Sequence, residues 1–206
     1  MSPDIAELLA TGEPINQLAA ANDYSWFPEW QGFFSNREGL AYALAAEGRT
    51  VLEIGSWKGR STMFAAATAK QIFAVDTWRG DDYAGRGWFF PEFEQNCREE
   101  IVAGRIVPVM CDWRGEPLVS EFLAHHQVVL YDADHAAESV EAFRSMIMWH
   151  DLKYLLIHDC DYAAESEAIQ RIAKENWPAV RVSYADRLAI VANLRDPIHS
   201  RLETRP

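Results

Sequence analysis

The sequence predicts an α/β fold: a doubly wound, mostly parallel seven-stranded sheet with helices on both faces and an antiparallel C-terminal strand pair. Two observations predict this fold. Short apolar runs of strand length alternate with longer segments of helical periodicity over residues 50–175, as in consecutive strand–helix–strand units. Two further apolar runs near the end of the chain, joined by a short turn, indicate the antiparallel pair.

Each predicted element follows from its own residue pattern. The predicted strands span residues 50–54, 71–76, 106–110, 128–131, 154–157, 180–184 and 188–192. The predicted helices span residues 35–46, 60–70, 91–103, 118–125, 136–149 and 163–175. Ser35, followed three residues later by Glu38, forms a capping-box pattern that starts the first of these helices. The loop over residues 77–91 is longer than most strand-to-helix connections, which indicates an active-site loop.

The chain divides into one main domain and two flanking segments. Its 206 residues favour a single domain, which we place at residues 35–194. Residues 1–34 are expected to form a helical and aromatic cover, either as buried packing or as a wall over a ligand pocket. Residues 195–206 are expected to be a frayed tail.

The charge of the chain argues against two classes of partner. Its formal net charge is −12, whereas nucleic-acid binding needs a basic surface, so we expect no nucleic-acid partner. An anionic membrane surface is disfavoured by the same negative charge, and no membrane span is expected, because no apolar run approaches the ~20 residues that span a bilayer. The three cysteines are widely spaced and odd in number, which favours a reducing, cytoplasmic location over a disulfide framework.

A glycine-containing turn after the first predicted strand is the first candidate ligand site. In the stretch EIGSWKGRST, an apolar run ends in an acid, Glu53, and a glycine, Gly55. A second glycine, Gly59, follows four residues later, and a helical pattern begins after it. Glycine suits a turn that a ligand approaches closely, and a helix N-terminus offers free N–H groups. Ser61 and Thr62 are candidate caps of that helix. The alternative is an ordinary strand-to-helix turn of an α/β domain.

The next strand favours the ligand-binding interpretation. It ends at Asp76, 21 residues after Gly55, which is near the spacing of ~20 for a carboxylate that takes ribose hydroxyls. A dinucleotide-binding fingerprint would need glycine at the positions of Trp57 and Arg60. The sequence therefore disfavours an NAD or nucleotide-sugar enzyme.

Acidic or histidine residues stand at the ends of all five predicted parallel strands. They are Glu53, Asp76, Asp112, Asp132 with His135, and His158 with Asp159. Any single one of them would be interpreted as a helix cap or a solvated turn residue. Ligands bind at the carboxyl ends of parallel strands, where the strand order reverses, so five such strand ends together indicate one site.

Four motifs give the chain a resemblance to a known family. EIGSWKGRST (53–62), AVDTW (74–78), YDADH (131–135) and IHD (157–159) resemble, in order and spacing, the motifs of class I S-adenosylmethionine (SAM)-dependent methyltransferases. Within that superfamily they resemble the group that includes macrocin O-methyltransferases and cephalosporin-hydroxylase-type proteins. Trp57 replaces the usual middle glycine of the first motif. The resemblance covers roughly residues 35–192 and implies a Rossmann-like methyltransferase fold.

The resemblance implies that SAM binds at the ends of the first three strands. The backbone of the glycine turn would hold the methionine end of SAM, Asp76 would take the ribose hydroxyls, and Asp112 would lie near the adenine. Trp78 is either a ring that stacks on the adenine or a packing residue. The residues expected to contact SAM are Glu53, Gly55, Ser56, Gly59, Ser61, Asp76, Thr77, Trp78, Cys111, Asp112, Trp113 and Asp132.

The resemblance also implies a site that a divalent metal assists. Related metal-dependent O-methyltransferases bind Mg²⁺ with an acid after the fourth strand and a pair after the fifth, which here are Asp132, His158 and Asp159. The metal would lower the pKa of a substrate hydroxyl, and His135 would act as the base that takes its proton. His158 stands where relatives carry an acid, and imidazole suits softer metals than Mg²⁺. The alternative is a metal-free site in which the acids cap helices and orient the histidines.

The sequence thus predicts a SAM-dependent enzyme that methylates a hydroxyl of a small molecule, of natural-product, sugar or phenol type. The rival prediction is a protein with the SAM-binding fold that transfers no methyl group, such as a partner subunit, because fold does not fix function. Relatives are often dimers or larger, so a homo-oligomer is expected. The alternative to His135 as the base is a surface histidine at the start of a helix. Cys160 is interpreted as a packing residue.

Overall fold

The structure, a computed structural model, describes residues 32–81, 85–176 and 178–194 of the chain. The strands are β1 (Thr50–Ile54), β2 (Gln71–Asp76), β3 (Gly80–Asp81), β4 (Gly85–Arg86), β5 (Ile106–Met110), β6 (Val128–Tyr131), β7 (Tyr154–Ile157), β8 (Val180–Ala185) and β9 (Leu188–Asn193). The helices are α3 (Asn36–Ala46), α4 (Arg60–Ala66), α5 (Phe90–Asn96), α6 (Arg98–Val102), α7 (Pro117–His125), α8 (Ala137–Met146) and α9 (Ala163–Asn176).

Seven of the strands form one sheet in the order β5-β2-β1-β6-β7-β9-β8. The first five in this order pair in parallel, and β9 runs antiparallel to both of its neighbours. The chain leaves β1 toward β2 and β5 on one side, and returns to β6 and β7 on the other. The strand order therefore reverses between β1 and β6, which is where ligands bind in folds of this kind. The predicted fold class is confirmed.

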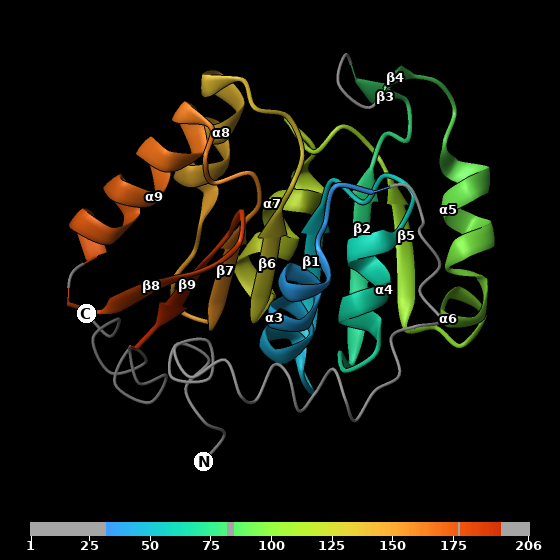
Figure 1. The fold of residues 1–206 in the computed structure, drawn as a ribbon, viewed down its shortest axis with the longest axis horizontal. Coiled ribbons are helices and arrows are strands. Elements are labelled where there is room, and N and C mark those ends of the chain that lie inside the picture. Colours follow the sequence, from blue (N-terminus) through green and yellow to red (C-terminus); the bar gives the residue numbers. More distant parts are fainter. Residues whose placement is uncertain (1–31, 82–84, 177, 195–206) are drawn as a thin grey trace.

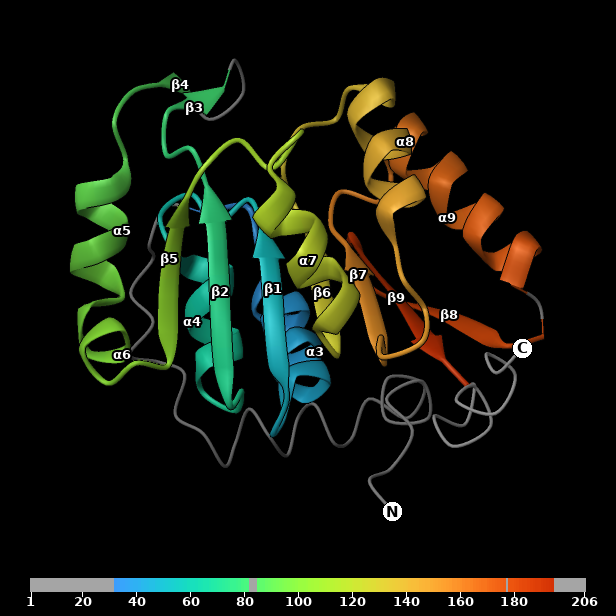
Figure 2. The same cartoon turned by 180° about the vertical axis from the view of Figure 1, so that it is seen from behind.

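Two hydrophobic cores lie on opposite faces of the sheet. Successive strand residues point to opposite faces, so Val51 belongs to the core under α3 and α4, whereas Leu52 belongs to the core under α7 and α8. Figure 1 shows α3 and α4 in front of the sheet, and Figure 2 shows α7 and α8 in front of it from behind. Because both faces are covered, the central strands are continuous apolar runs rather than alternating ones.

The predicted start of α3 is confirmed. The Ser35 Oγ accepts a hydrogen bond from the Glu38 N–H at 3.2 Å, and the Glu38 carboxylate accepts one from the Ser35 N–H at 2.5 Å. The remainder of the predicted cover, residues 1–31, and the predicted tail, residues 195–206, lie outside the described residues.

Three predicted helices differ in extent from the observed ones. The helix predicted over 60–70 ends at Ala66, because the next residues turn to pair with the α3–β1 connection, where Lys70 N–H donates to the Arg49 carbonyl. The helix predicted over 91–103 is divided at Cys97 into α5 and α6. The helix predicted over 136–149 ends at Met146, because Ile147 has an extended backbone.

The predicted active-site loop after β2 contains a short antiparallel hairpin, formed by β3 and β4. Each of these strands has only two residues, too few for a period-2 pattern to be recognised. Figure 1 shows the hairpin projecting beyond the carboxyl ends of the strands. Among the described residues, no helix is long and apolar enough to cross a membrane.

Candidate functional site

A pocket of about 320 Å³ lies at the carboxyl ends of β1, β2, β5, β6 and β7, at the reversal of strand order. Most of the residues predicted to form the site line it: Gly55, Ser56, Ser61, Asp76, Thr77, Cys111, Asp112, Trp113, Asp132, His135, His158 and Asp159. The pocket thus joins residues from five strand ends, as the strand-end pattern predicts. Three predicted site residues, Glu53, Gly59 and Trp78, do not line it.

The glycine turn brings the end of β1 against the end of β6. Gly55 has φ +92°, and a Cβ at this position would lie 1.9 Å from the backbone oxygen of Asp132. Trp57, in place of the usual glycine, has φ +39°, which is uncommon for a bulky residue. Gly55 is therefore required by the close approach of two chain segments as well as by its own backbone conformation.

Asp76 supports this turn from the end of β2. Its Oδ2 accepts hydrogen bonds from the Ser56 and Trp57 N–H groups at 2.9 and 2.8 Å, and its Oδ1 accepts one from the Trp78 N–H at 2.6 Å. Burial raises the pKa of Asp76, although the bonds from these N–H groups oppose the rise. The carboxylate lies in the pocket wall, so the predicted contact with a ribose remains a prediction.

Glu53 lies beneath the turn and does not line the pocket, and its predicted contact with SAM stays a prediction. The side chain is fully buried and accepts hydrogen bonds from Tyr42 Oη at 3.0 Å, Ser61 Oγ at 2.9 Å and Thr62 Oγ1 at 2.7 Å. Burial raises its pKa to about 7. Ser61 and Thr62 therefore do not cap α4 as predicted. The N-cap is Gly59, which makes no side-chain cap bond.

Gly59 and Trp78, two further residues predicted to contact SAM, pack against other parts of the chain. Gly59 has φ +88°, and a Cβ there would lie 2.5 Å from the Cys97 Sγ, so the contact of the turn with the end of α5 needs glycine at this position. Trp78 is fully buried, with its ring centroid 4.9 Å from that of Phe90 and 4.8 Å from that of Phe93. Of the two alternatives for Trp78, packing is the one the structure supports.

The end of β5 forms the side of the pocket predicted to face the adenine. Cys111, Asp112 and Trp113 all line it, and Trp113 packs edge-on against Tyr131 in the core behind. Asp112 is held by Arg114, whose Nε and Nη2 donate to its two carboxylate oxygens at 3.0 Å each. These bonds lower the pKa of Asp112, so the carboxylate is ionised at neutral pH.

Asp132, His158 and Asp159 converge on the opposite side of the pocket. The His158 Nδ1 lies 3.1 Å from Asp132 Oδ1 and 3.2 Å from Asp159 Oδ1. One ligand atom from each residue lies within 4.8 Å of the others, which is close enough for all three to bind one metal ion. The predicted ligand set is therefore together in space.

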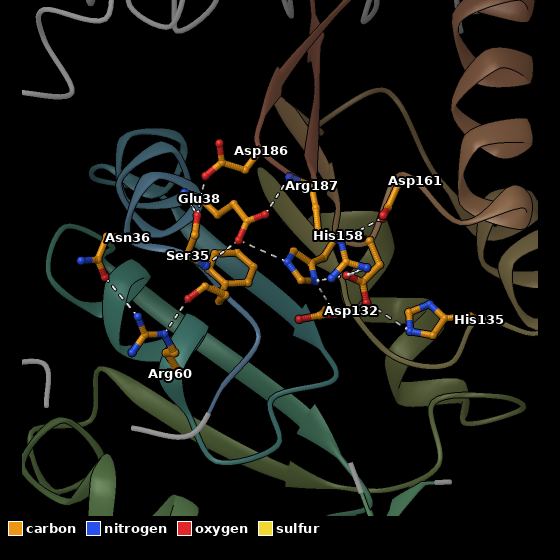
Figure 3. A network of polar contacts seen from close by, with 12 residues as sticks. Ser35, Asn36, Glu38, Arg60, Asp132, His135, His158, Asp161, Asp186 and Arg187 are labelled. Atoms are coloured by element: carbon orange, nitrogen blue, oxygen red, sulfur yellow. Dashed lines mark hydrogen bonds and ion pairs between the residues drawn. The ribbon is translucent and has the colours of Figure 1, made fainter. Parts of the chain in front are cut away.

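The His158 ring is held from its other side as well. Its Nε2 lies 3.4 Å from Glu38 Oε2, and its face stacks on Phe34 with ring centroids 4.7 Å apart. Figure 3 shows the ring between Glu38 and Asp132. Although burial opposes the effect, the carboxylates of Asp132, Glu38 and Asp159 raise the pKa of His158 to about 10.

His135 lies in the pocket, but two carboxylates flank its ring. Its Nδ1 is 2.6 Å from Glu165 Oε1, and its Nε2 is 3.2 Å from Asp159 Oδ2. Asp159 and Glu165 raise the pKa of His135 to about 10, so the imidazole is protonated at neutral pH. The ring lines the pocket, and the predicted role as base requires it first to lose this proton.

The residue pattern of the chain matches the sequence profile of a family described as a methyltransferase domain. The match covers residues 52–181, which is more than half of the chain and includes the glycine turn and both histidines of the pocket. The chain belongs to this family. No curated protein matches the sequence of this methyltransferase significantly.

Solved structures resemble the methyltransferase in fold. A Streptococcus mutans protein solved in complex with SAH has a TM-score of 0.52 at 12% sequence identity, with 74% of this chain and 93% of that one covered. A precorrin-6y C5,15-methyltransferase from Geobacter metallireducens has a TM-score of 0.51 at 11% identity, with 76% and 87% covered. At these identities, the likeness concerns the fold alone, and it agrees with the predicted Rossmann-like architecture.

Three residues of the methyltransferase's pocket region were not predicted: Glu165, Tyr162 and Arg187. Glu165 is fully buried in α9, one and two turns before Ile169 and Ile172 on the same helix face. An acid on the apolar face of a helix was the signal that could have revealed it. Arg187, in the β8–β9 turn, contacts Asp159 with its Nη2 at 2.7 Å. No pattern in the sequence marks that contact.

Proposed function

We propose that this methyltransferase transfers the methyl group of SAM to a hydroxyl group of a small molecule. The observation that carries the proposal is the division of the pocket into two chemically different halves. One half, the cofactor half, contains the glycine turn, Asp76 and Asp112. The other half, the acceptor half, contains Asp132, His135, His158 and Asp159 together with Tyr162 and Arg187.

The cofactor half suits the polar groups of SAM. The turn at Gly55 and Ser56 offers backbone to the methionine end, and the carboxylate of Asp76 is suited to ribose hydroxyls. Asp112 and Trp113 offer a carboxylate and a ring edge at the place expected for the adenine. The family membership and the SAH found in the Streptococcus mutans protein support this choice of cofactor.

The acceptor half suits a hydroxyl group because it gathers carboxylates and imidazoles around one point. Methyl transfer forms an oxygen–carbon bond and breaks the sulfur–carbon bond of SAM, which leaves SAH, and the hydroxyl proton must go to a group in the pocket. The reaction needs the oxygen, the methyl carbon and the sulfur in line, so positioning of the acceptor contributes much of the rate. Ionised residues that accept and donate hydrogen bonds supply that positioning.

A divalent metal ion fits this half. Two carboxylates and one imidazole, from Asp132, Asp159 and His158, form a mixed oxygen and nitrogen donor set. Such a set suits Mn²⁺, Fe²⁺ or Zn²⁺ better than Mg²⁺, which prefers oxygen ligands alone. A bound ion would lower the pKa of a coordinated hydroxyl. If activity survives complete removal of metal by a chelator, this part of the proposal is wrong.

His135 is our candidate for the group that receives the hydroxyl proton. With a pKa of about 10, only about one ring in a thousand is neutral at pH 7. As a base, it would therefore make kcat/KM rise with pH toward 10. Substitution of His135 by glutamine should remove that rise and cost about 10²–10⁴-fold in turnover. A flat pH profile would exclude His135 as the base.

The charge of the chain supports a small acceptor rather than a nucleic acid. A net charge of −12 would repel RNA, and the acceptor half itself contains two carboxylates at the pocket surface, Asp132 and Asp159. The three cysteines are free thiols, which supports a reducing, cytoplasmic environment. The oligomeric state stays a prediction, with a homo-oligomer expected.

The second candidate function is a protein that binds SAM without transferring a methyl group. The observation that favours it is that both histidines of the acceptor half are held as charged groups between carboxylates. A site with this pairing is stable without any substrate. Turnover with a hydroxylated acceptor separates the two functions.

The deciding experiment is a calorimetric titration with S-adenosylhomocysteine (SAH), followed by a methyl-transfer assay with isotopically labelled SAM and a panel of sugar and phenol acceptors. Binding of SAH with labelled product supports the proposal. Binding without product from any acceptor favours the second candidate. A chain that binds no SAH would overturn both, since each depends on the cofactor half.

A further inference from the structure

Glu38 makes more contacts than a capping residue needs. Besides the Ser35 N–H at 2.5 Å, its carboxylate accepts a hydrogen bond from the Arg187 N–H at 2.8 Å and faces His158 Nε2 at 3.4 Å. The side chain is 1% exposed. The two carboxylate oxygens thus face two backbone N–H groups and one ring nitrogen, from three separate parts of the chain, and Figure 3 shows Glu38 joined by dashed lines to both His158 and Arg187.

Only an ionised carboxylate fits this position. Oε2 faces the Ser35 N–H and the ring of His158, and Oε1 faces the Arg187 N–H, so both oxygens must act as acceptors. Although burial opposes the effect, His158 and the N–H of Ser35 lower the pKa of Glu38, which keeps it charged. A glutamine has one acceptor oxygen, so if that oxygen accepts from the Ser35 N–H, its NH₂ group is directed at the Arg187 N–H.

Glu38 also determines which nitrogen of His158 faces the pocket. With Nε2 directed at Glu38, Nδ1 is the atom that points toward Asp132 and Asp159. A histidine that binds a metal commonly donates its other ring N–H to a carboxylate, which fixes the tautomer and strengthens the metal–nitrogen bond. The Glu38–His158–Asp132 arrangement has this form.

We propose that Glu38 is a positioning residue of the acceptor half: it keeps the proton of His158 on Nε2, so that Nδ1 serves as a metal ligand beside Asp132 and Asp159. The proposal rests on the metal site proposed above. The first turn of α3 then takes part in the site. The capping-box pattern by itself indicates only that this turn starts a helix.

The test compares Mn²⁺ binding to the full wild-type chain, to Glu38→Gln and to Ser35→Ala, by calorimetry. Glutamine is accepted at the third position of a capping box, so Glu38→Gln keeps a cap. It should weaken Mn²⁺ binding by about 10- to 100-fold, as loss of a carboxylate behind a metal-bound histidine does. Ser35→Ala removes the cap hydroxyl without touching His158 and should bind Mn²⁺ as the wild type does.

A second measurement uses the diamagnetic ion Zn²⁺ and ¹⁵N NMR of the histidine rings. In the wild-type chain with Zn²⁺, His158 should carry its proton on Nε2 and bind through Nδ1. If Glu38→Gln does not fold, Glu38→Asp, which keeps the charge but withdraws it by one methylene group, takes its place in both measurements. The folded state of every variant is checked by circular dichroism and a thermal melt.

Two results would overturn the inference while leaving the metal site in place: equal Mn²⁺ affinity in wild type and Glu38→Gln, or an equal loss in Glu38→Gln and Ser35→Ala. Binding of His158 to Zn²⁺ through Nε2 would also overturn it. If the wild type binds neither ion, the metal site and the inference fail together. The SAH titration tests binding to the cofactor half independently of any metal. Loss of the metal site is therefore distinguishable from failure of the proposed function.

Discussion

Replacement of Glu53 by glutamine should change how the stability of the protein depends on pH. Glu53 is fully buried, and its pKa of about 7 lies well above its ordinary value of 4.5. Burial dominates the shift, because bonds from the hydroxyls of Thr62, Ser61 and Tyr42 act in the opposite direction. The native chain therefore favours the neutral acid more strongly than the unfolded chain does.

The sign and size of the effect follow from this difference. Between pH 4.5 and 7 the native state holds a proton that the unfolded state has released, so the free energy of unfolding falls as pH rises. A pKa difference of about 2.5 corresponds to about 3 kcal/mol at pH values above both pKa values. Glutamine at position 53 has the same shape and no charge, and its NH₂ can donate to a hydroxyl oxygen. The variant therefore lacks the pH-dependent loss of about 3 kcal/mol in unfolding free energy.

The assay is urea unfolding, followed by tryptophan fluorescence, of wild type and Glu53→Gln from pH 4.5 to pH 8.5. The difference in unfolding free energy, variant minus wild type, should rise by about 3 kcal/mol over this range and level off above pH 8. Glu47→Gln, at an exposed glutamate after α3, is the matched control and should show no such rise. A difference that stays flat for Glu53→Gln, or falls with pH, would refute the reasoning.

Three further substitutions test other parts of the site. Gly55→Ala should destabilise the fold by about 2 kcal/mol or more, since its Cβ would overlap the Asp132 backbone at a φ of +92°, and an unchanged melting temperature would contradict this. Asp76→Asn should weaken SAH binding by about tenfold or more, because a charged acceptor is lost, and calorimetry measures it. Glu165→Gln should lower the pKa of His135 from about 10, because a carboxylate that stabilises the imidazolium is removed. An NMR titration measures this pKa, and a value that stays at about 10 would show that Asp159 alone sets it.

The sheet was predictable from sequence because its strands are continuous apolar runs, each followed by a polar residue. Asp132, His158 and Asp159 come together for the same reason, since β6 and β7 are neighbours whose carboxyl ends meet at one edge. The strand order accounts for the nearness of these three residues. The prediction needed no knowledge of side-chain conformation.

The directions of other side chains were not predictable, because they depend on packing. Glu53 is the next-to-last residue of β1, and its side chain points beneath the turn toward α3 and α4, because the strand alternates between the two faces of the sheet. Trp78 follows a pocket residue, but φ +52° turns it into the core. Glu38 and Arg187 meet across 149 positions of the sequence, and no local pattern reports such a contact.

The link between the start of α3 and the β8–β9 turn has a consequence for the order of folding. Ser35 Oγ donates to Asp186 Oδ2 across 151 positions, and the neighbouring Glu38 accepts from Arg187. Contacts this distant in sequence close a large loop and form late. A nascent chain can thus form the glycine turn and strands β1, β2 and β6 while its acceptor half is still open. Only when the last two strands have been made and have docked does His158 gain its full set of neighbours.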